Sequence, residues 1–204
     1  QMFSIWIYLT LTEILGLIKK IYFPREIIPL AVIIANFIHF MMALAVFFLF
    51  LLAVWILNPG VPPFQATSIY LPLLLIIQFL LTTGLGLLIS SLNVFFEDVK
   101  YIVGVILYLL FFLSPIMYFA DTVYYKSGET AYFIYHLNPI AALCTAYRKT
   151  LLASQTIETA PGVHSPGLAM DWTNIGIAAA VSVFFLFVGY AVFNRLKWKF
   201  VERP

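Results

Sequence analysis

Long apolar runs separated by short polar segments dominate the chain. Residues 27–96 contain no Asp, Glu, Lys or Arg, and about 20 apolar residues are enough for a helix to cross a bilayer. This stretch is long enough to cross twice, and Asn58-Pro59-Gly60 divides it with a turn. Because unpaired backbone groups are costly in lipid, each crossing should be an α-helix.

Five charge-poor runs have the length and composition of membrane-spanning helices. We predict spans at residues 2–18, 30–57, 69–93, 100–120 and 172–194. The second would be about 42 Å long at 1.5 Å per residue, so it should tilt or protrude from the ~30 Å hydrocarbon core. The predicted fold class is an all-α membrane protein, a bundle of about five transmembrane helices in a single domain covering residues 1–204.

The basic residues beside these spans predict the orientation, because Lys and Arg are retained on the cytoplasmic side. With residues 19–26 inside, eight basic residues lie inside and three outside. The inner set is Lys19, Lys20, Arg25, Lys100, Arg195, Lys197, Lys199 and Arg203, and the outer set is Lys126, Arg148 and Lys149. This distribution predicts a multi-pass protein with a cytoplasmic C-terminus.

Residues 130–152 are apolar but interrupted by Asn138-Pro139, and two interpretations are open. A sixth crossing would move Arg148 and Lys149 inside and the basic tail outside, leaving six basic residues against five. Two short helices of about 6 and 13 residues that enter from the outer side and turn back at Asn138-Pro139 preserve the orientation, and broken backbone is tolerated where protein shelters it. We therefore predict an outer re-entrant hairpin at 130–152.

Composition argues against a soluble domain and against a nucleic-acid-binding protein. The chain is 63% hydrophobic and only 10% charged, whereas a soluble domain carries about 25% charged residues. The net charge of +2 is too small to indicate nucleic-acid binding. Gln1 opens inside an apolar run without an initiator Met or a basic n-region, so we expect the chain to begin within a longer protein.

Candidate catalytic chemistry is sparse in the sequence. No G-x-x-x-x-G-K-[ST] phosphate-binding loop occurs, so ATP would be used only through a partner chain. His39, His136 and His164 lack the spacing of metal ligands, and Cys144 is interpreted as a packing residue. We predict that the chain is not an enzyme and binds no cofactor and no metal.

Two predicted cytoplasmic turns carry residues suited to docking a soluble partner. The first is a rigid elbow of both charge signs, and the second is a short turn with acidic and aromatic residues. They comprise Lys19, Lys20, Phe23, Pro24, Arg25 and Glu26, and Asn93, Phe96, Glu97 and Asp98. The alternatives are positive-inside anchoring for the lysines and, for the carboxylates, stabilisation of the following helix by about 0.3–1 kcal/mol through its dipole.

Polar and aromatic residues within the spans have two interpretations each. Asn36 and His39 share a helix face, as do Gln78 and Thr82, which favours interhelical hydrogen bonds over substrate contact. An aromatic set, with its first three members on one face, could line a path for sugar rings or pack against lipid. It comprises Tyr101, Tyr108, Phe112 and Tyr118.

Several segments together resemble one protein family. They are residues 17–30, residues 93–115, Asn138-Pro139 followed by Tyr147-Arg148, and the closing residues 200–203. In matching order they resemble the permease subunits of bacterial type-2 ABC exporters for lipid-linked polysaccharides and polyol phosphates, which are the O-antigen and teichoic-acid exporters. The chain departs from the family at Glu97-Asp98, where an Arg-Asp pair is usual.

The resemblance implies a six-helix subunit preceded by an amphipathic interface helix, so that the interface helix and first span would be absent here. It implies a homodimer in the bacterial cytoplasmic membrane with two ATPase subunits that bind ATP and Mg, and outward export of an undecaprenyl-diphosphate-linked polysaccharide or teichoic acid. The two turns would then contact the ATPase. The rival is a self-contained ion-coupled carrier or lipid-modifying enzyme, for which only Glu13 and His39 offer ionisable groups within spans.

Overall fold

The computed structural model describes residues 27–57, 66–96, 98–152, 156–160 and 163–196. The predicted span at 2–18, the elbow at 19–26, Glu97 and the tail at 197–204 lie outside these residues. The elements in chain order are α2 (Ile27–Leu57), η1 (Ala66–Tyr70), α3 (Leu71–Phe95), α4 (Val99–Leu113), α5 (Asp121–His136), α6 (Pro139–Leu151), β1 (Thr156–Ala160), β2 (Val163–Pro166) and α7 (Trp172–Leu196). The predicted all-α membrane class is confirmed.

Three helices are long and apolar enough to cross a membrane within the described ranges. They are Ile27–Leu57, Thr67–Phe95 and Trp172–Leu196, close to the predicted 30–57, 69–93 and 172–194. The first of these helices contains Pro29 in its first turn. A proline is tolerated there because the N–H group that it lacks would have no helical partner. Pro72 has the same favourable position at the start of α3.

The predicted helix 100–120 is shorter in the structure. α4 has 15 residues and ends at Leu113, which at 1.5 Å per residue gives about 22 Å. The cause is Pro115, because the residue before a proline is driven out of the helical region. Ser114 is accordingly extended, with φ −91° and ψ 146°.

The segment between α4 and α7 also differs from its prediction. α5 has 16 residues rather than about six, and Gly128 breaks it with φ 86°. α6 has 13 residues and begins directly after Asn138. Antiparallel strands β1 and β2 follow, with Thr156 opposite Pro166; the sequence did not predict this β-hairpin.

The core lies where α3, α6 and α7 meet. Its buried members come from all three helices, so α6 is packed against both long helices rather than lying free on the surface. They are Leu74, Ile77, Leu81, Leu143, Ala146 and Ile175.

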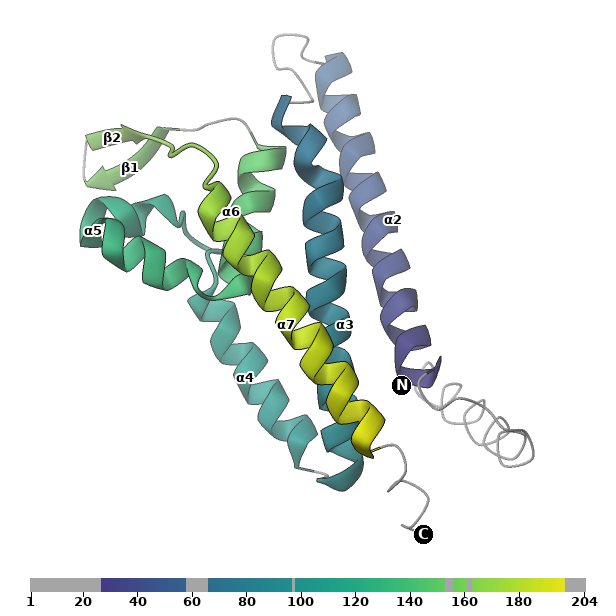
Figure 1. Ribbon diagram of the computed structural model, residues 1–204. Coiled ribbons are helices and arrows are strands. Elements are labelled where there is room, and N and C mark those ends of the chain that lie inside the picture. Colours follow the sequence, from purple (N-terminus) through teal and green to yellow (C-terminus); the bar gives the residue numbers. More distant parts are fainter. Residues whose placement is uncertain (1–26, 58–65, 97, 153–155, 161–162, 197–204) are drawn as a thin grey trace.

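The two ends of the bundle are built from different elements (Figure 1). At one, the turn end, the α3–α4 turn lies near the start of α2 and the end of α7. At the other, the hairpin end, α5, α6 and the two strands are gathered. Most polar contacts described below belong to the hairpin end.

Candidate functional site

The polar groups of the hairpin end converge on residues 114–120, which we call the connector because they join α4 to α5. Both ends of the connector are sequestered, since Pro115 is buried near α4 and Ala120 near α5. Its middle is exposed, with 81% of Met117 accessible. The connector is therefore anchored at its ends and held in between by side chains from α6.

Arg148 of α6 holds the middle of the connector. Its Nη1 donates to the carbonyl oxygen of Tyr118 at 2.7 Å, and its Nη2 donates to that of Ile116 at 3.1 Å. The guanidinium carbon also lies 4.8 Å from the centre of the Phe119 ring. This arrangement uses the planar fork of arginine, which a lysine cannot reproduce.

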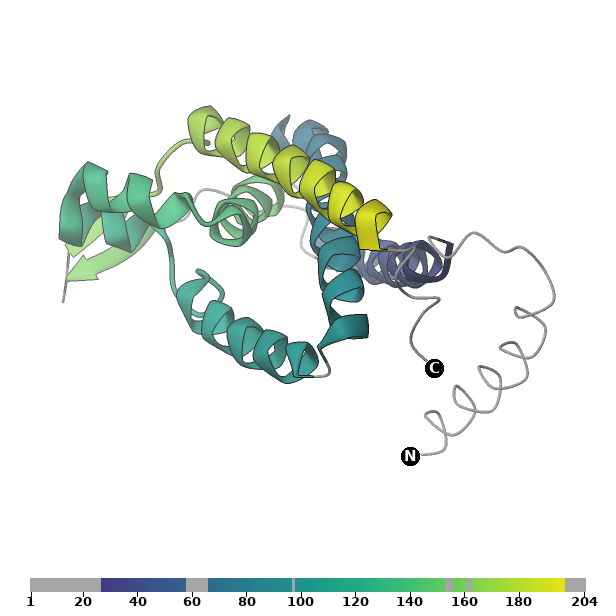
Figure 2. The same ribbon diagram turned by 60° about the horizontal axis from the view of Figure 1, so that its bottom comes forward.

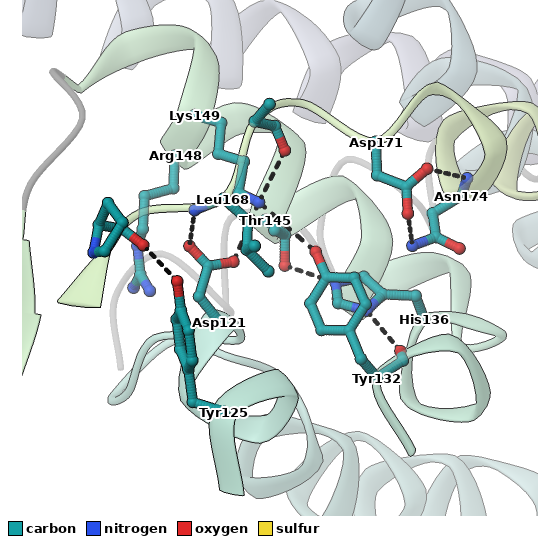
Figure 3. A network of polar contacts seen from close by, with 12 residues as sticks. Asp121, Tyr125, Tyr132, His136, Thr145, Arg148, Lys149, Leu168, Asp171 and Asn174 are labelled. Carbon is teal, nitrogen blue, oxygen red and sulfur yellow. Dashed lines mark hydrogen bonds and ion pairs between the residues drawn. The ribbon is translucent and has the colours of Figure 1, made fainter. Parts of the chain in front are cut away.

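Lys149, the next residue, contacts the start of α5 (Figure 3). Its Nζ lies 3.0 Å from Asp121 Oδ1, with 14% and 8% of the two side chains exposed. The same Nζ donates to the carbonyl oxygen of Ala169 at 3.2 Å and to the hydroxyl of Tyr132 at 3.4 Å. Lys149 thus joins α5, α6 and the segment that leads into α7.

Two aspartates complete these attachments. The other oxygen of Asp121 accepts from the backbone N–H of Leu168 at 3.2 Å. Asp171 accepts from the backbone N–H of Thr173 at 3.0 Å and from Asn174 Nδ2 at 2.6 Å. A carboxylate at this position stabilises the N-terminus of α7, because it pairs with N–H groups that lack helical partners.

His136 is enclosed between α5 and α6, with 2% of its side chain exposed. Its Nδ1 donates to the carbonyl oxygen of Tyr132 at 2.8 Å, and its Nε2 is paired with the hydroxyl of Thr145 at 3.1 Å. Burial lowers the pKa of the imidazole, which favours the neutral form. No cluster of His, Cys, Asp or Glu that could hold a metal occurs in the described part of the chain, and these contacts give His136 a packing role.

Two further contacts fix α6 in place. Asn138 caps the helix, since its side-chain oxygen accepts from the backbone N–H of Ile140 at 3.1 Å. Tyr147 donates its hydroxyl to the side-chain oxygen of Gln78 on α3 at 2.6 Å. This is one of the interhelical hydrogen bonds for which Gln78 was a candidate, whereas Asn36 bonds within its own helix to Val32.

A cavity of about 870 Å³ lies between α2, α3, α4 and α6. Its wall is apolar except for a few groups on α3 and α6. The polar members are Gln78, Thr82, Tyr147 and Arg148, and apolar members include Phe40, Phe47, Leu85 and Leu107. Cys144 also lines it, so the single cysteine faces this space.

The predicted aromatic path is not assembled around this cavity. Tyr101, Tyr108 and Phe112 are 68%, 67% and 58% exposed, while Val103 and Leu107 are the residues of α4 that line the cavity. Helical geometry places those two positions on roughly the opposite face of α4. Tyr118 is separate from the other three, and its hydroxyl lies 2.7 Å from that of Tyr135.

At the turn end, the described part of the predicted coupling turn is open. Asn93 and Asp98 are exposed, and 63% of Phe96 is accessible. Asp98 precedes α4 but its side chain caps no N–H of that helix. The carboxylate of Asp98 therefore makes no capping hydrogen bond, and stabilisation of α4 by Asp98 would act through the helix dipole alone.

The sequence analysis did not identify Asp121 as a site residue or as the partner of Lys149. The two residues lie on different helices, and no periodicity links them. Opposite charge was the available signal, since Asp121 and Lys149 both lie in segments predicted to be on the outer side. Arg148 was identified, but its contacts with the connector were not.

Comparison with known proteins gives a consistent result. Residues 2–152 match the model of a family described as ABC-2 type transporter. The chain is 27% identical over 186 residues to the O-antigen export system permease protein RfbA of Klebsiella pneumoniae, which covers 91% of this chain and 63% of the relative. It is 26% identical to the protein of the same name from Myxococcus xanthus, covering 91% and 64%. The chain thus spans less than two thirds of the length of these curated relatives.

Proposed function

The chain belongs to the ABC-2 type transporter family, and on this premise we propose that it is the permease part of an ATP-driven exporter of lipid-linked cell-surface polysaccharide. The polymer is carried on undecaprenyl diphosphate and moves from the inner to the outer face of the bacterial cytoplasmic membrane. The observation that carries this proposal is the similarity to O-antigen export permeases over 91% of the chain. A teichoic acid is the second candidate polymer, because its exporters share the sequence resemblance.

The proposed energy source is a separate cytoplasmic ATPase subunit that binds ATP and Mg. The sequence contains no phosphate-binding loop. The docking surface is the α3–α4 turn together with residues 19–26. The exposure of Phe96 and the uncommitted carboxylate of Asp98 support this assignment, because aromatic and charged groups on a short turn suit a protein partner.

A second copy of the chain is the proposed partner within the membrane. Exposed apolar side chains along α4 support this, since Tyr101, Tyr108 and Phe112 cover one face without packing on the described helices. In a dimer this face lies toward the second copy and the polymer path between them, where aromatic rings suit sugar rings. Asn138, Pro139, Tyr147 and Arg148 fix the outer hairpin beside the exit.

An ion-coupled carrier or a lipid-modifying enzyme is less well supported. A carrier needs ionisable groups at mid-bilayer, and His39 is such a group in the apolar helices that the structure describes. It lies exposed on α2. An enzyme would need converging acid, base or metal ligands, whereas His136 is committed to packing contacts.

The test reconstitutes the full-length protein in proteoliposomes, with and without the proposed ATPase subunit. ATP hydrolysis and transfer of an undecaprenyl-diphosphate-linked glycan to the opposite leaflet should require both proteins. Parallel vesicles with a lipid-linked polyol phosphate distinguish the two polymer classes. Hydrolysis by the isolated permease, or glycan transfer driven by an ion gradient without ATP, would refute the proposal.

A further inference from the structure

α4 is supported at its ends rather than along its length (Figure 2). None of its 15 residues is buried by the described chain, whereas α3 and α7 bury residues throughout. At the turn end, the N–H of Val99 donates to the carbonyl oxygen of Phe96 at 3.1 Å, which makes the link to α3 short. At the hairpin end, α4 continues directly into the connector.

The connector is attached to α6 by one side chain that bridges two of its peptide units. Arg148 donates to the carbonyl oxygens of Ile116 and Tyr118 and stacks on Phe119. The connector also forms a tight turn, with the N–H of Ile116 donating to the carbonyl oxygen of Ser114 at 2.7 Å. Only two residues separate the end of α4 at Leu113 from Ile116, the first connector residue that Arg148 contacts. Movement at the end of α4 therefore reaches Arg148 over a short distance along the chain.

We propose that Arg148 is the positioning residue that transmits a displacement of α4 to the outer hairpin formed by α5 and α6. This inference rests on the proposed function, in which a partner subunit pushes on the α3–α4 turn. α4 then acts as a rod between the docking turn at Phe96 and the connector. Arg148 converts the shift of the rod into a shift of α6 at the exit of the polymer path.

The neighbouring residue Lys149 has a different task. It is buried with Asp121 and reaches Ala169, so it holds α5, α6 and the approach to α7 together. The side-chain hydrogen bonds of Arg148, by contrast, go to the connector. Because the Lys149 ion pair, the Asn138 cap and the Tyr147–Gln78 bond do not involve Arg148, the hairpin should keep its fold without it.

The experiment measures export and ATP hydrolysis by the full-length protein with its ATPase subunit in proteoliposomes. Arg148→Ala should lower export at least about tenfold while ATP hydrolysis continues, since two charge-assisted hydrogen bonds are lost. Arg148→Lys should be similarly impaired, because an ammonium group keeps the charge but lacks the planar fork that places one N–H group on each carbonyl oxygen and stacks on Phe119. Full export by Arg148→Lys would show that charge alone matters and overturn the proposal.

A covalent link between the connector and α6 provides the second arm. Arg148 and Tyr118, whose carbonyl oxygen accepts from Arg148, are both replaced by cysteine in a Cys144→Ala background, so that a bifunctional thiol reagent can join the connector to α6. Cross-linking should restore export in this double-cysteine protein by tying the connector to α6 again. The same protein before cross-linking, and the two single-cysteine proteins treated with the reagent, are the matched controls.

The outcomes separate this inference from the proposed function. If wild-type protein exports and Arg148→Ala exports equally well, the transmission role of Arg148 is wrong. A loss of export in Arg148→Ala that accompanies a lower Tm and poor membrane insertion also overturns it, as does a loss of export in the double-cysteine protein that cross-linking does not relieve. If wild-type protein with its ATPase does not export any lipid-linked polymer, the proposed function fails instead.

Discussion

Gly84 of α3 and Gly189 of α7 meet backbone to backbone where the two helices cross. A Cβ atom on Gly84 would lie 2.5 Å from the backbone nitrogen of Leu186, and one on Gly189 would collide with the carbonyl oxygen of Gly84. Small residues continue this contact, with Ala178 and Ser182 almost fully buried. Membrane helices associate through such close packing, because lipid offers no hydrophobic driving force between them.

Gly189→Ala and Gly84→Ala should therefore each destabilise the helix pair, by about 1–3 kcal/mol for overpacking. Thermal unfolding of the purified full-length protein in detergent measures the effect as a lower Tm. Gly176→Ala is the matched control on the same helix, since a Cβ there meets nothing within 4 Å. Equal Tm values for Gly189→Ala and Gly176→Ala would contradict the close crossing.

The ion pair between Lys149 and Asp121 gives a second prediction. Lys149→Met leaves the Asp121 carboxylate buried without its cation, and breaking a buried pair in this way costs about 3–5 kcal/mol. We expect a large loss of Tm in detergent. The double variant Lys149→Met with Asp121→Leu should be more stable than Lys149→Met alone, because no buried charge is then left unpaired. A double variant less stable than both single variants would argue against this account.

His136 should make stability depend on pH. Burial lowers the pKa of its imidazole, and Lys149 adds to this effect. The hydrogen bond to the Tyr132 carbonyl and the charges of Asp171 and Asp121 raise the pKa, but by less than the other two lower it. Below about pH 6.5 the unfolded chain binds a proton at His136 that the folded protein does not bind. The contribution of His136 to the free energy of unfolding is therefore constant above about pH 6.5 and decreases as the pH drops below it. Unfolding of wild type and His136→Gln from about pH 7.5 to about pH 5, a range that includes the ordinary histidine pKa, should show the decline for wild type alone. An identical decline in both proteins would assign it to other groups.

The long helices were predictable because lipid leaves little choice of structure. A charge-free run such as that of α2 can satisfy its backbone only as a helix. The end of α4 at Leu113 could also have been predicted, because Pro115 drives the residue before it out of the helical region. The contacts between distant residues were different: nothing in the sequence pairs Lys149 with Asp121 or Gly84 with Gly189, because each pair is created by the crossing of separate helices. Arg148 could be singled out as a residue, but its two carbonyl acceptors depend on where the connector turns.

The α3–α4 turn should be more important for export than for membrane insertion. Phe96→Ala combined with Asp98→Lys removes an exposed ring and reverses an exposed charge, and the loss of such a contact typically costs about 1–2 kcal/mol, or roughly tenfold in export rate. Export assays and the amount of inserted protein are measured together. Lys126→Glu, an exposed charge reversal on α5 at the hairpin end, is the matched control and should export normally. Normal export by the turn variant would leave this surface without a partner.

The last prediction concerns which end of the bundle faces the cytoplasm. Asn93 lies near the turn end and Ser127 on α5 at the hairpin end, and both side chains are exposed. The excess of basic residues beside the turn end predicts that this end is cytoplasmic.

In intact cells, a cysteine replacing Ser127 should react with a membrane-impermeant maleimide, and a cysteine replacing Asn93 should not. Both variants are made in a Cys144→Ala background, because Cys144 is a free and only half-buried thiol. Labelling of both after permeabilisation is the control for accessibility. Replacing Asn138-Pro139 by Leu-Leu removes the cap of α6 and the proline that begins it, so the last turn of α5 and α6 could fuse into one continuous apolar helix over residues 132–152. If that helix crosses, α7 inverts and a cysteine replacing Arg195, at the end of α7, becomes reactive from outside. Labelling of Asn93→Cys but not Ser127→Cys in the otherwise unaltered protein would reverse the orientation and place the α3–α4 turn where no cytoplasmic ATPase can reach it.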